Sequence, residues 1–267
     1  MFLTKKSFIK ILIVAICFFA IGCFFIGLDL VFMSIGVSDG LTLKLGLIEC
    51  LLALLMVAGG MYGEGKAKLI QLGNKLVRKE LKPMEFIKHY EHLQNSQDLI
   101  IKKTSMEVLQ LVAVAYDVMN EKEKALATIE EMVEVADGKK KTFATLLKVA
   151  FLFGDNKIEE AEALFVDVQK QKLDLLSQSL ADAILKGDRA FAMGDYRTAE
   201  AYHLKLLQQG FPKMDNLGKL VSHYALGEIY EKLEEKDKAI TYYEYCMKFG
   251  GETGIKQSAK EKLEELQ

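Results

Sequence analysis

The feature that most constrains the fold is the spacing of apolar residues in residues 220–249. Leu226, Gly227 and Tyr230 fall on one face of a predicted helix. A second predicted helix carries a buried stripe of Ala239, Ile240, Tyr243, Cys246 and Met247. One such hairpin cannot bury its own apolar face, so we expect further copies of it.

Copies are found upstream by using Ala239 as a register mark. Equivalent alanines are Ala199, Ala161 and Ala125, at successive intervals of 40, 38 and 36 residues. Each begins a predicted helix that follows a turn, and no strand-like alternation lies between them. The pattern therefore predicts an all-α chain of helix–turn–helix units.

This pattern resembles the tetratricopeptide repeat (TPR) family over roughly residues 104–250. The turn Gly194-Asp195-Tyr196 directly before Ala199 is similar to the turn signature of that family. The resemblance implies a TPR-like α-solenoid of about four degenerate repeats in which each first helix lines a concave groove. The charged segment 255–266 is predicted to be a C-terminal capping helix, so the repeat domain spans 104–267.

The first 63 residues differ in character, with two runs of 18 residues at 11–28 and 45–62 in which Glu49 is the one charge. A helix of about 20 apolar residues crosses a bilayer core of about 30 Å. We therefore expect a two-span transmembrane hairpin over 1–63. A lipoprotein-type cleavage before Cys23 is a rival interpretation of the first run.

Basic residues set the expected topology. Three lysines precede the first span, Lys44 stands alone in the connecting segment, and several lysines and Arg78 follow the second span. Both termini and the repeats are thus expected in the cytoplasm, at a bacterial plasma membrane. We interpret residues 64–103 as basic juxtamembrane helices. An alternative interpretation is that part of this segment is a degenerate fifth repeat.

No motif for catalysis or cofactor binding is found. The four cysteines include no Cys-x-x-Cys pair, and His89 and His92 lack a third ligand that the pattern would fix. The net charge of −2 gives no basic field for nucleic acid. We predict a non-enzymatic protein without cofactor or metal. Glu49 is the intramembrane charge and a functional candidate, although it lies about one turn from the outer interface.

The resemblance implies that the concave groove is the binding site for a protein or peptide. Its candidate residues are Gln110, Val114, Asp117, Leu146, Ala150, Phe153, Ile184, Asp188, Phe191, Tyr224, Glu228 and Glu231. This surface is apolar with acidic sides, which favours an apolar segment with basic flanks as partner. An alternative interpretation is that Leu146, Phe153 and Phe191 only pack against neighbouring repeats.

Two functions are compatible with this organisation. The first is a membrane-anchored cytoplasmic scaffold that mediates protein–protein interactions. The alternative is an accessory subunit of a membrane transport or enzyme complex, in which the transmembrane helices take part directly.

Overall fold

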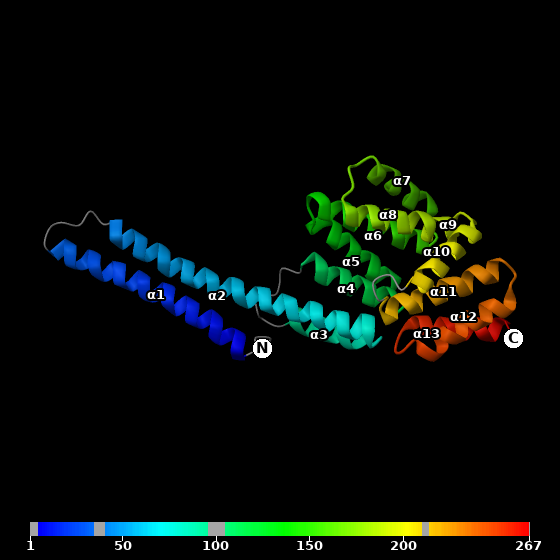
Figure 1. The fold of residues 1–267 in the computed structure, drawn as a ribbon, viewed down its shortest axis with the longest axis horizontal. Coiled ribbons are helices and arrows are strands. Elements are labelled where there is room, and N and C mark those ends of the chain that lie inside the picture. Colours follow the sequence, from blue (N-terminus) through cyan, green and yellow to red (C-terminus); the bar gives the residue numbers. More distant parts are fainter. Residues whose placement is uncertain (1–4, 35–40, 96–104, 210–213, 267) are drawn as a thin grey trace. The chain divides into compact units, whose positions relative to one another are not determined.

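The computed structural model describes residues 5–34, 41–95, 105–209 and 214–266. These residues form helices and their connections, without a strand, which confirms the all-α prediction for the described chain (Figure 1). The chain divides into two compact units. The first comprises Met1–Leu69 with Ser96–Lys103, and the second comprises Ile70–Asn95 with Thr104–Gln267. The second unit thus includes residues 70–95, which the sequence placed in a juxtamembrane segment.

The first unit contains α1 (Lys5–Ser34) and the larger part of α2 (Leu41–Gly73), which run in opposite directions (Figure 1). Large apolar side chains are exposed along both, including Ile16, Phe24 and Leu54. The residues described as buried between 5 and 58 are small ones, Ala15, Gly22 and Ala53. No helix built from the described residues has both the length and the apolar character needed to cross a bilayer.

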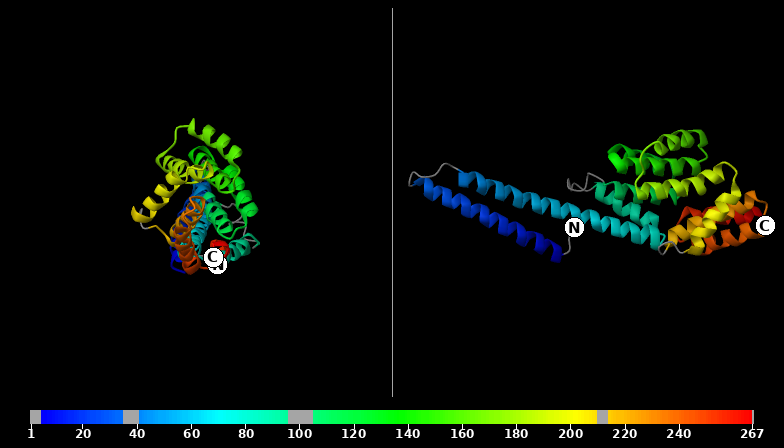
Figure 2. Two further views of the ribbon diagram at one scale, coloured as in Figure 1. Left: turned by 90° about the vertical axis from the view of Figure 1, so that its right-hand side faces the viewer. Right: turned by 45° about the horizontal axis from the view of Figure 1, so that its top comes forward.

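The second unit begins with the end of α2, the π-helix η1 (Asn74–Lys79) and α3 (Pro83–Asn95). Four helical pairs follow one another in chain order (Figure 2). They are α4 (Met106–Asp117) with α5 (Lys122–Val135), α6 (Gly138–Gly154) with α7 (Ile158–Gln169), α8 (Leu175–Lys186) and α9 (Asp188–Ala192) with α10 (Tyr196–Gln209), and α11 (Asn216–Lys232) with α12 (Lys236–Phe249). The chain ends with α13 (Gly254–Leu266), packed on α12 and α11.

The turn inside each pair has the same backbone geometry. Asn120, Asn156, Gly194 and Glu234 all have positive φ, and each stands five residues before one of the register alanines. The next residue's N–H returns to a carbonyl five residues earlier, as in the bond from Glu235 to Tyr230 at 2.9 Å. This is the Schellman arrangement, which satisfies the last carbonyls of a helix. All four register alanines are completely buried.

Small residues stand where paired helices cross. A Cβ on Gly227 of α11 would lie 2.5 Å from the Tyr243 ring of α12, so only glycine allows this approach. The third pair departs from the others because its first helix is interrupted at Gly187, between α8 and α9. A Cβ there would lie 3.1 Å from the Tyr202 ring and 3.0 Å from the Ala183 carbonyl oxygen.

Contacts between distant segments close the second unit on itself. The Gly254 N–H donates to the Val118 carbonyl at 2.7 Å, and Asn120 Nδ2 donates to Ser258 Oγ at 3.0 Å. The start of α13 therefore lies against the turn of the first pair. Nearby, the Glu252 N–H donates to the Leu81 carbonyl at 2.9 Å.

A second set of contacts ties η1 to the last pair. Arg78 forms an ion pair with Asp215 at 3.1 Å, and Asn216 Nδ2 donates to the Lys79 carbonyl at 2.6 Å. Asp215 also caps α11 by accepting the Gly218 N–H at 2.8 Å. The two ends of the second unit are thus joined by main-chain and side-chain bonds.

Candidate functional site

A cavity of about 820 Å³ lies at the ends of the first helices of the pairs, and we call it the central cavity. Its wall comes from the α4–α5 and α6–α7 turns, α9, α10, α11 and α13. The bonds between Gly254 and Val118 and between Asn120 and Ser258 lie in this wall, so the contact between α13 and the first turn encloses one side of it. The volume is within the range of sites that hold a ligand or an inserted side chain.

A smaller hollow of about 280 Å³, the side pocket, adjoins the central cavity. It lies between α4, α5 and α6, with Gln110, Val114 and Ala150 in its lining. Asp117 and Asp188 line both spaces. The two carboxylates therefore stand where the side pocket meets the central cavity.

The structure brings ten of the twelve groove candidates to these two spaces. Leu146 and Ile184 do not line either, because both are completely buried in the core around α6. Phe153 belongs both to the cavity wall and to the core. It lines the central cavity, but its side chain is only 4% exposed and packs edge-to-face on Phe165. The candidates that line a space are Gln110, Val114, Asp117, Ala150, Phe153, Asp188, Phe191, Tyr224, Glu228 and Glu231.

Carboxylates occupy equivalent positions of different pairs. Asp188 and Glu228 each stand eleven residues before a register alanine, where the first two pairs have Val114 and Ala150. Eight residues before that alanine, the first and last pairs have Asp117 and Glu231, and the two middle pairs have Phe153 and Phe191. Since the pairs share one register, these two positions bring four carboxylates and two aromatic rings to the central cavity.

The cavity raises the pKa of its carboxylates. Burial, and then the charge of Asp117, raises the pKa of Asp188 from 3.8 to about 7. Burial and the neighbouring Glu231 raise the pKa of Glu228 from 4.5 to about 7, against the opposing charge of Lys262. The pKa of Asp117 is also raised, first by burial and then by the charge of Asp155, while the charge of Lys122 acts in the opposite direction. The Asp117 side chain is nevertheless exposed, so water reaches it.

These carboxylates lack the partners that other acidic residues have. Glu231 accepts a hydrogen bond from Tyr243 Oη at 2.5 Å and pairs with Lys262 Nζ at 3.3 Å. In the described part of the chain, the side chains of Asp117, Asp188 and Glu228 form no ion pair. A cation that entered the cavity would therefore find carboxylates not already paired with a described basic side chain.

His203, which lines the central cavity, does not supply a positive charge to these carboxylates. His203 stands four residues after Ala199, where the other pairs have Ile129, Phe165 and Tyr243. Its Nδ1 is buried without a hydrogen-bond partner in the described structure. Burial lowers the pKa of His203 to about 4, so the ring is neutral at physiological pH.

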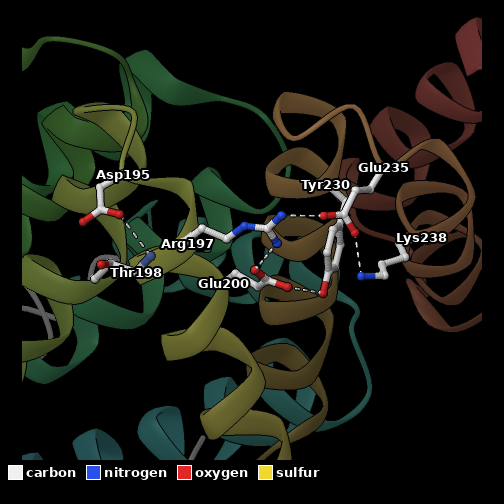
Figure 3. Close-up of polar contacts among 7 residues, drawn as sticks. All are labelled: Asp195, Arg197, Thr198, Glu200, Tyr230, Glu235 and Lys238. Atoms are coloured by element: carbon white, nitrogen blue, oxygen red, sulfur yellow. Dashed lines mark hydrogen bonds and ion pairs between the residues drawn. The ribbon is translucent and has the colours of Figure 1, made fainter.

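A polar network fixes the third pair against the fourth, beside the cavity (Figure 3). Arg197 of α10 contacts Glu200 and Glu235, each at 2.7 Å, and so links the two pairs. Glu200 also accepts a hydrogen bond from Tyr230 Oη at 2.6 Å, and Lys238 pairs with Glu235 at 2.5 Å (Figure 3). At the start of α10, the Asp195 carboxylate accepts the Thr198 N–H at 3.2 Å.

Other candidates lie elsewhere or are not described. The Glu49 side chain is outside the described residues. Where side chains are described, no three His, Cys, Asp or Glu residues gather as metal ligands. Sequence reasoning missed the closure by α13, because the positive φ that asparagine tolerates in a turn is shared by Asn120 and Asn156, and only Asn120 bonds to α13 in the described structure.

Comparison with protein-family models, with curated proteins and with solved structures finds no match for this chain.

Proposed function

We propose that this chain is a membrane-anchored cytoplasmic scaffold of the TPR type, which binds proteins and carries out no catalysis. Its central cavity takes an apolar segment of a partner that carries basic residues. The observation that carries this proposal is a set of carboxylates that form no ion pair with any described residue, Asp117, Asp188 and Glu228, beside the partly exposed Phe191. An ammonium or guanidinium group with apolar neighbours complements such a surface in charge and in polarity.

The assignment to the TPR type is supported by the repeated backbone geometry. Four helical pairs share a left-handed turn residue and a buried alanine five residues later. A series of such pairs, each packed on the next, is the architecture that presents a concave surface in helical-repeat proteins. The third pair, α8 and α9 with α10, departs from the pattern by its interrupted first helix.

Membrane anchoring is supported by the sequence and by the side-chain distribution in the first unit. Residues 11–28 carry no charge, and α1 and α2 expose large side chains while small ones are buried. Soluble helical pairs have the opposite arrangement, whereas small residues at helix contacts and large apolar residues outside are typical of helices in lipid. The distribution of lysines supports a topology with both termini in the cytoplasm, by the positive-inside rule.

A cross-linking experiment tests the partner site. Phe153 is a poor probe because its replacement would disturb the core, so we choose Phe191, which is partly exposed. A photo-reactive residue at 191 in the full chain is irradiated in membranes, and the attached segment is identified by mass spectrometry after detergent solubilisation. We expect the cross-linked segment to carry Lys or Arg beside apolar residues. The yield of the cross-link should fall at high salt.

Matched variants decide whether the cavity recognises that segment. Asp188→Lys and Glu228→Lys should abolish the cross-link, while Glu134→Lys, at an exposed site outside the cavity, should leave it unchanged. Equal cross-linking in all three variants, with unchanged circular dichroism, would remove the cavity as the binding site.

The alternative is an accessory subunit in which the membrane helices act directly, and Glu49 within residues 45–62 is the observation that favours it. Replacing residues 1–63 by an unrelated two-span anchor of the same topology separates the two. Retained capture of the partner and retained cellular function support the scaffold. Retained capture with lost function supports the active membrane part.

A further inference from the structure

One end of the α6–α7 pair carries charges that do not favour its own folding. Lys139, Lys140 and Lys141 form the first turn of α6, which contains no acidic residue. The N-terminus of a helix is its positive pole, so each exposed lysine there is unfavourable by up to about 1 kcal/mol. None of the three forms an ion pair within the described residues. Their position is thus better explained by something outside the chain.

Exposed leucines occur at the same end. Leu175 and Leu176, the first residues of α8, are 88% and 64% exposed. Burying a leucine side chain stabilises a protein by about 1.5–3 kcal/mol. Neither Leu175 nor Leu176 contributes this stabilisation in full, because both are exposed. Val135, three residues before α6, is 56% exposed.

Contacts place these residues together. Thr142 Oγ1 of α6 donates to Gln171 Oε1 in the α7–α8 connection at 3.0 Å. The pKa of Asp174 is lowered first by hydrogen bonds from Ser177 and also by the charge of Lys139. Since Asp174 caps α8, Lys139 lies near the start of the helix that carries the two leucines. We call Lys139–Lys141, Lys172, Leu175 and Leu176 the lysine–leucine end.

Of the acidic residues at this end, Asp174 and Asp167 are already occupied, and the N-cap Asp137 of α6, whose side chain makes no capping bond, is outnumbered by the lysines. Asp174 accepts the Ser177 N–H at 2.8 Å, and Asp167 pairs with Lys170 at 2.8 Å. Lys172 is exposed and, in the described chain, forms no ion pair. The lysines therefore remain available to an external anion.

We propose that the lysine–leucine end contacts an anionic bilayer surface, with the leucines in the interface and the lysines at the lipid phosphates. Adjacent exposed apolar and basic side chains are the combination that binds such an interface. Each well-placed lysine contributes about 1 kcal/mol near an anionic leaflet. This inference rests on the proposed anchor only in that the anchor brings the chain to a bilayer. Its consequence is a second contact that orients the central cavity with respect to the membrane.

The absence of tryptophan from the sequence allows a direct test. Leu175→Trp gives the full chain a single indole at this end, and Met247→Trp gives the matched control on α12, at a side chain that is 41% exposed. Both variants are reconstituted into nanodiscs of phosphatidylcholine with about 30% phosphatidylglycerol, with and without brominated acyl chains. We expect at least ~2-fold quenching for Leu175→Trp, a blue-shifted emission, and neither effect for Met247→Trp.

Charge dependence is the second arm. Lys139→Glu, Lys140→Glu and Lys141→Glu combined in the Leu175→Trp chain should abolish the quenching, as should about 0.5 M salt. The matched reversal Lys256→Glu with Lys260→Glu on α13 should not. Quenching that is equal at both tryptophans, or unchanged by reversal of the three lysines, overturns the proposal. A blue shift in lipid-free detergent that grows with protein concentration would also overturn it, since a second copy would then cover the leucines.

Failure of the anchor is distinguishable from failure of this surface. Co-elution of the chain with nanodiscs of phosphatidylcholine alone reports on the anchor, since the lysine–leucine end requires an anionic lipid. If the chain does not co-elute with these nanodiscs, flotation of the full chain with vesicles that contain about 30% phosphatidylglycerol tests the surface independently. The proposal then requires flotation that depends on phosphatidylglycerol and is lost on reversal of Lys139–Lys141, and flotation without either dependence contradicts it.

Discussion

The main-chain N–H of Gly254 donates a 2.7 Å hydrogen bond to the carbonyl of Val118. This bond joins the first residue of α13 to the end of α4, at opposite ends of the series of helical pairs. An open series of repeats would leave both ends to solvent and its concave surface as a groove. Here α13 contributes Ile255, Ser258 and Lys262 to the wall of the central cavity. The C-terminal helix is therefore part of the site.

Replacing Gly254 should weaken this closure. A Cβ at this position would lie 2.9 Å from Asn120 Nδ2 and 2.9 Å from the Met119 carbonyl carbon. We expect Gly254→Ala to lower the free energy of unfolding by about 1–3 kcal/mol, because the main chain at Met119 must shift. Gly154→Ala is the control, since its Cβ would meet nothing within 4 Å. Chemical denaturation measures the change, and faster hydrogen exchange at Gly254 in the alanine variant locates it.

The shared turn geometry predicts opposite effects at two equivalent positions. Glu234 has φ 59° and Gly194 has φ 79°, a region that costs a residue with a Cβ about 1–2 kcal/mol. Glu234→Gly should therefore stabilise the protein by about 0.5–1 kcal/mol, since the greater freedom of unfolded glycine offsets part of the gain. Gly194→Ala should destabilise it by about 1 kcal/mol. Thermal unfolding followed by circular dichroism checks both, and equal shifts of the same sign would contradict the assignment of equivalent turns.

The cavity carboxylates predict a pH dependence with a definite sign. The pKa of Asp188 rises from 3.8, and that of Glu228 from 4.5, to about 7 on folding. Between about pH 4 and pH 7 the folded state therefore binds more protons than the unfolded state. The contribution of both groups to stability is then largest below pH 4 and is lost as the pH rises to about 7.

Amide variants isolate this contribution. We expect Asp188→Asn and Glu228→Gln each to raise the free energy of unfolding at pH 8 by about 1 kcal/mol, after allowance for solvent screening at partly exposed sites. At pH 4.0 the difference should be much smaller, because both carboxyls are then protonated in the folded state. Exposed Glu134 supplies the control variant Glu134→Gln. Variants that are less stable at pH 8 than the parent chain would contradict the assigned direction.

Sequence periodicity predicted the helices well because they depend on local spacing. The alanines placed in register by their 36–40 residue intervals are the completely buried Ala125, Ala161, Ala199 and Ala239. The same periodicity could not separate a cavity wall from a helix contact, since both are apolar. Leu146 and Ile184 were therefore assigned to the groove, whereas the structure buries them in the core.

Closure of the second unit was not predictable for a different reason. The bonds from Gly254 to Val118 and from Glu252 to Leu81 join main-chain atoms, which every residue possesses. A main-chain bond leaves no side-chain signature in the sequence. The break at Gly187 was equally hidden, because a glycine late in a helical pattern is compatible with a continuous helix, a kink or a cap.

The central claim is that an N-terminal hairpin holds a helical-repeat scaffold on the cytoplasmic side of a membrane. Its most direct test is the extraction of membranes with alkaline carbonate, combined with protease digestion of a C-terminal tag on the full chain. We predict that the chain stays in the membrane pellet, that the tag is protected in intact cells, and that it is digested in inside-out vesicles. Removal of residues 1–63 should release the chain into the supernatant. Complete extraction of the full chain by carbonate, or digestion of the tag in intact cells, would contradict the account.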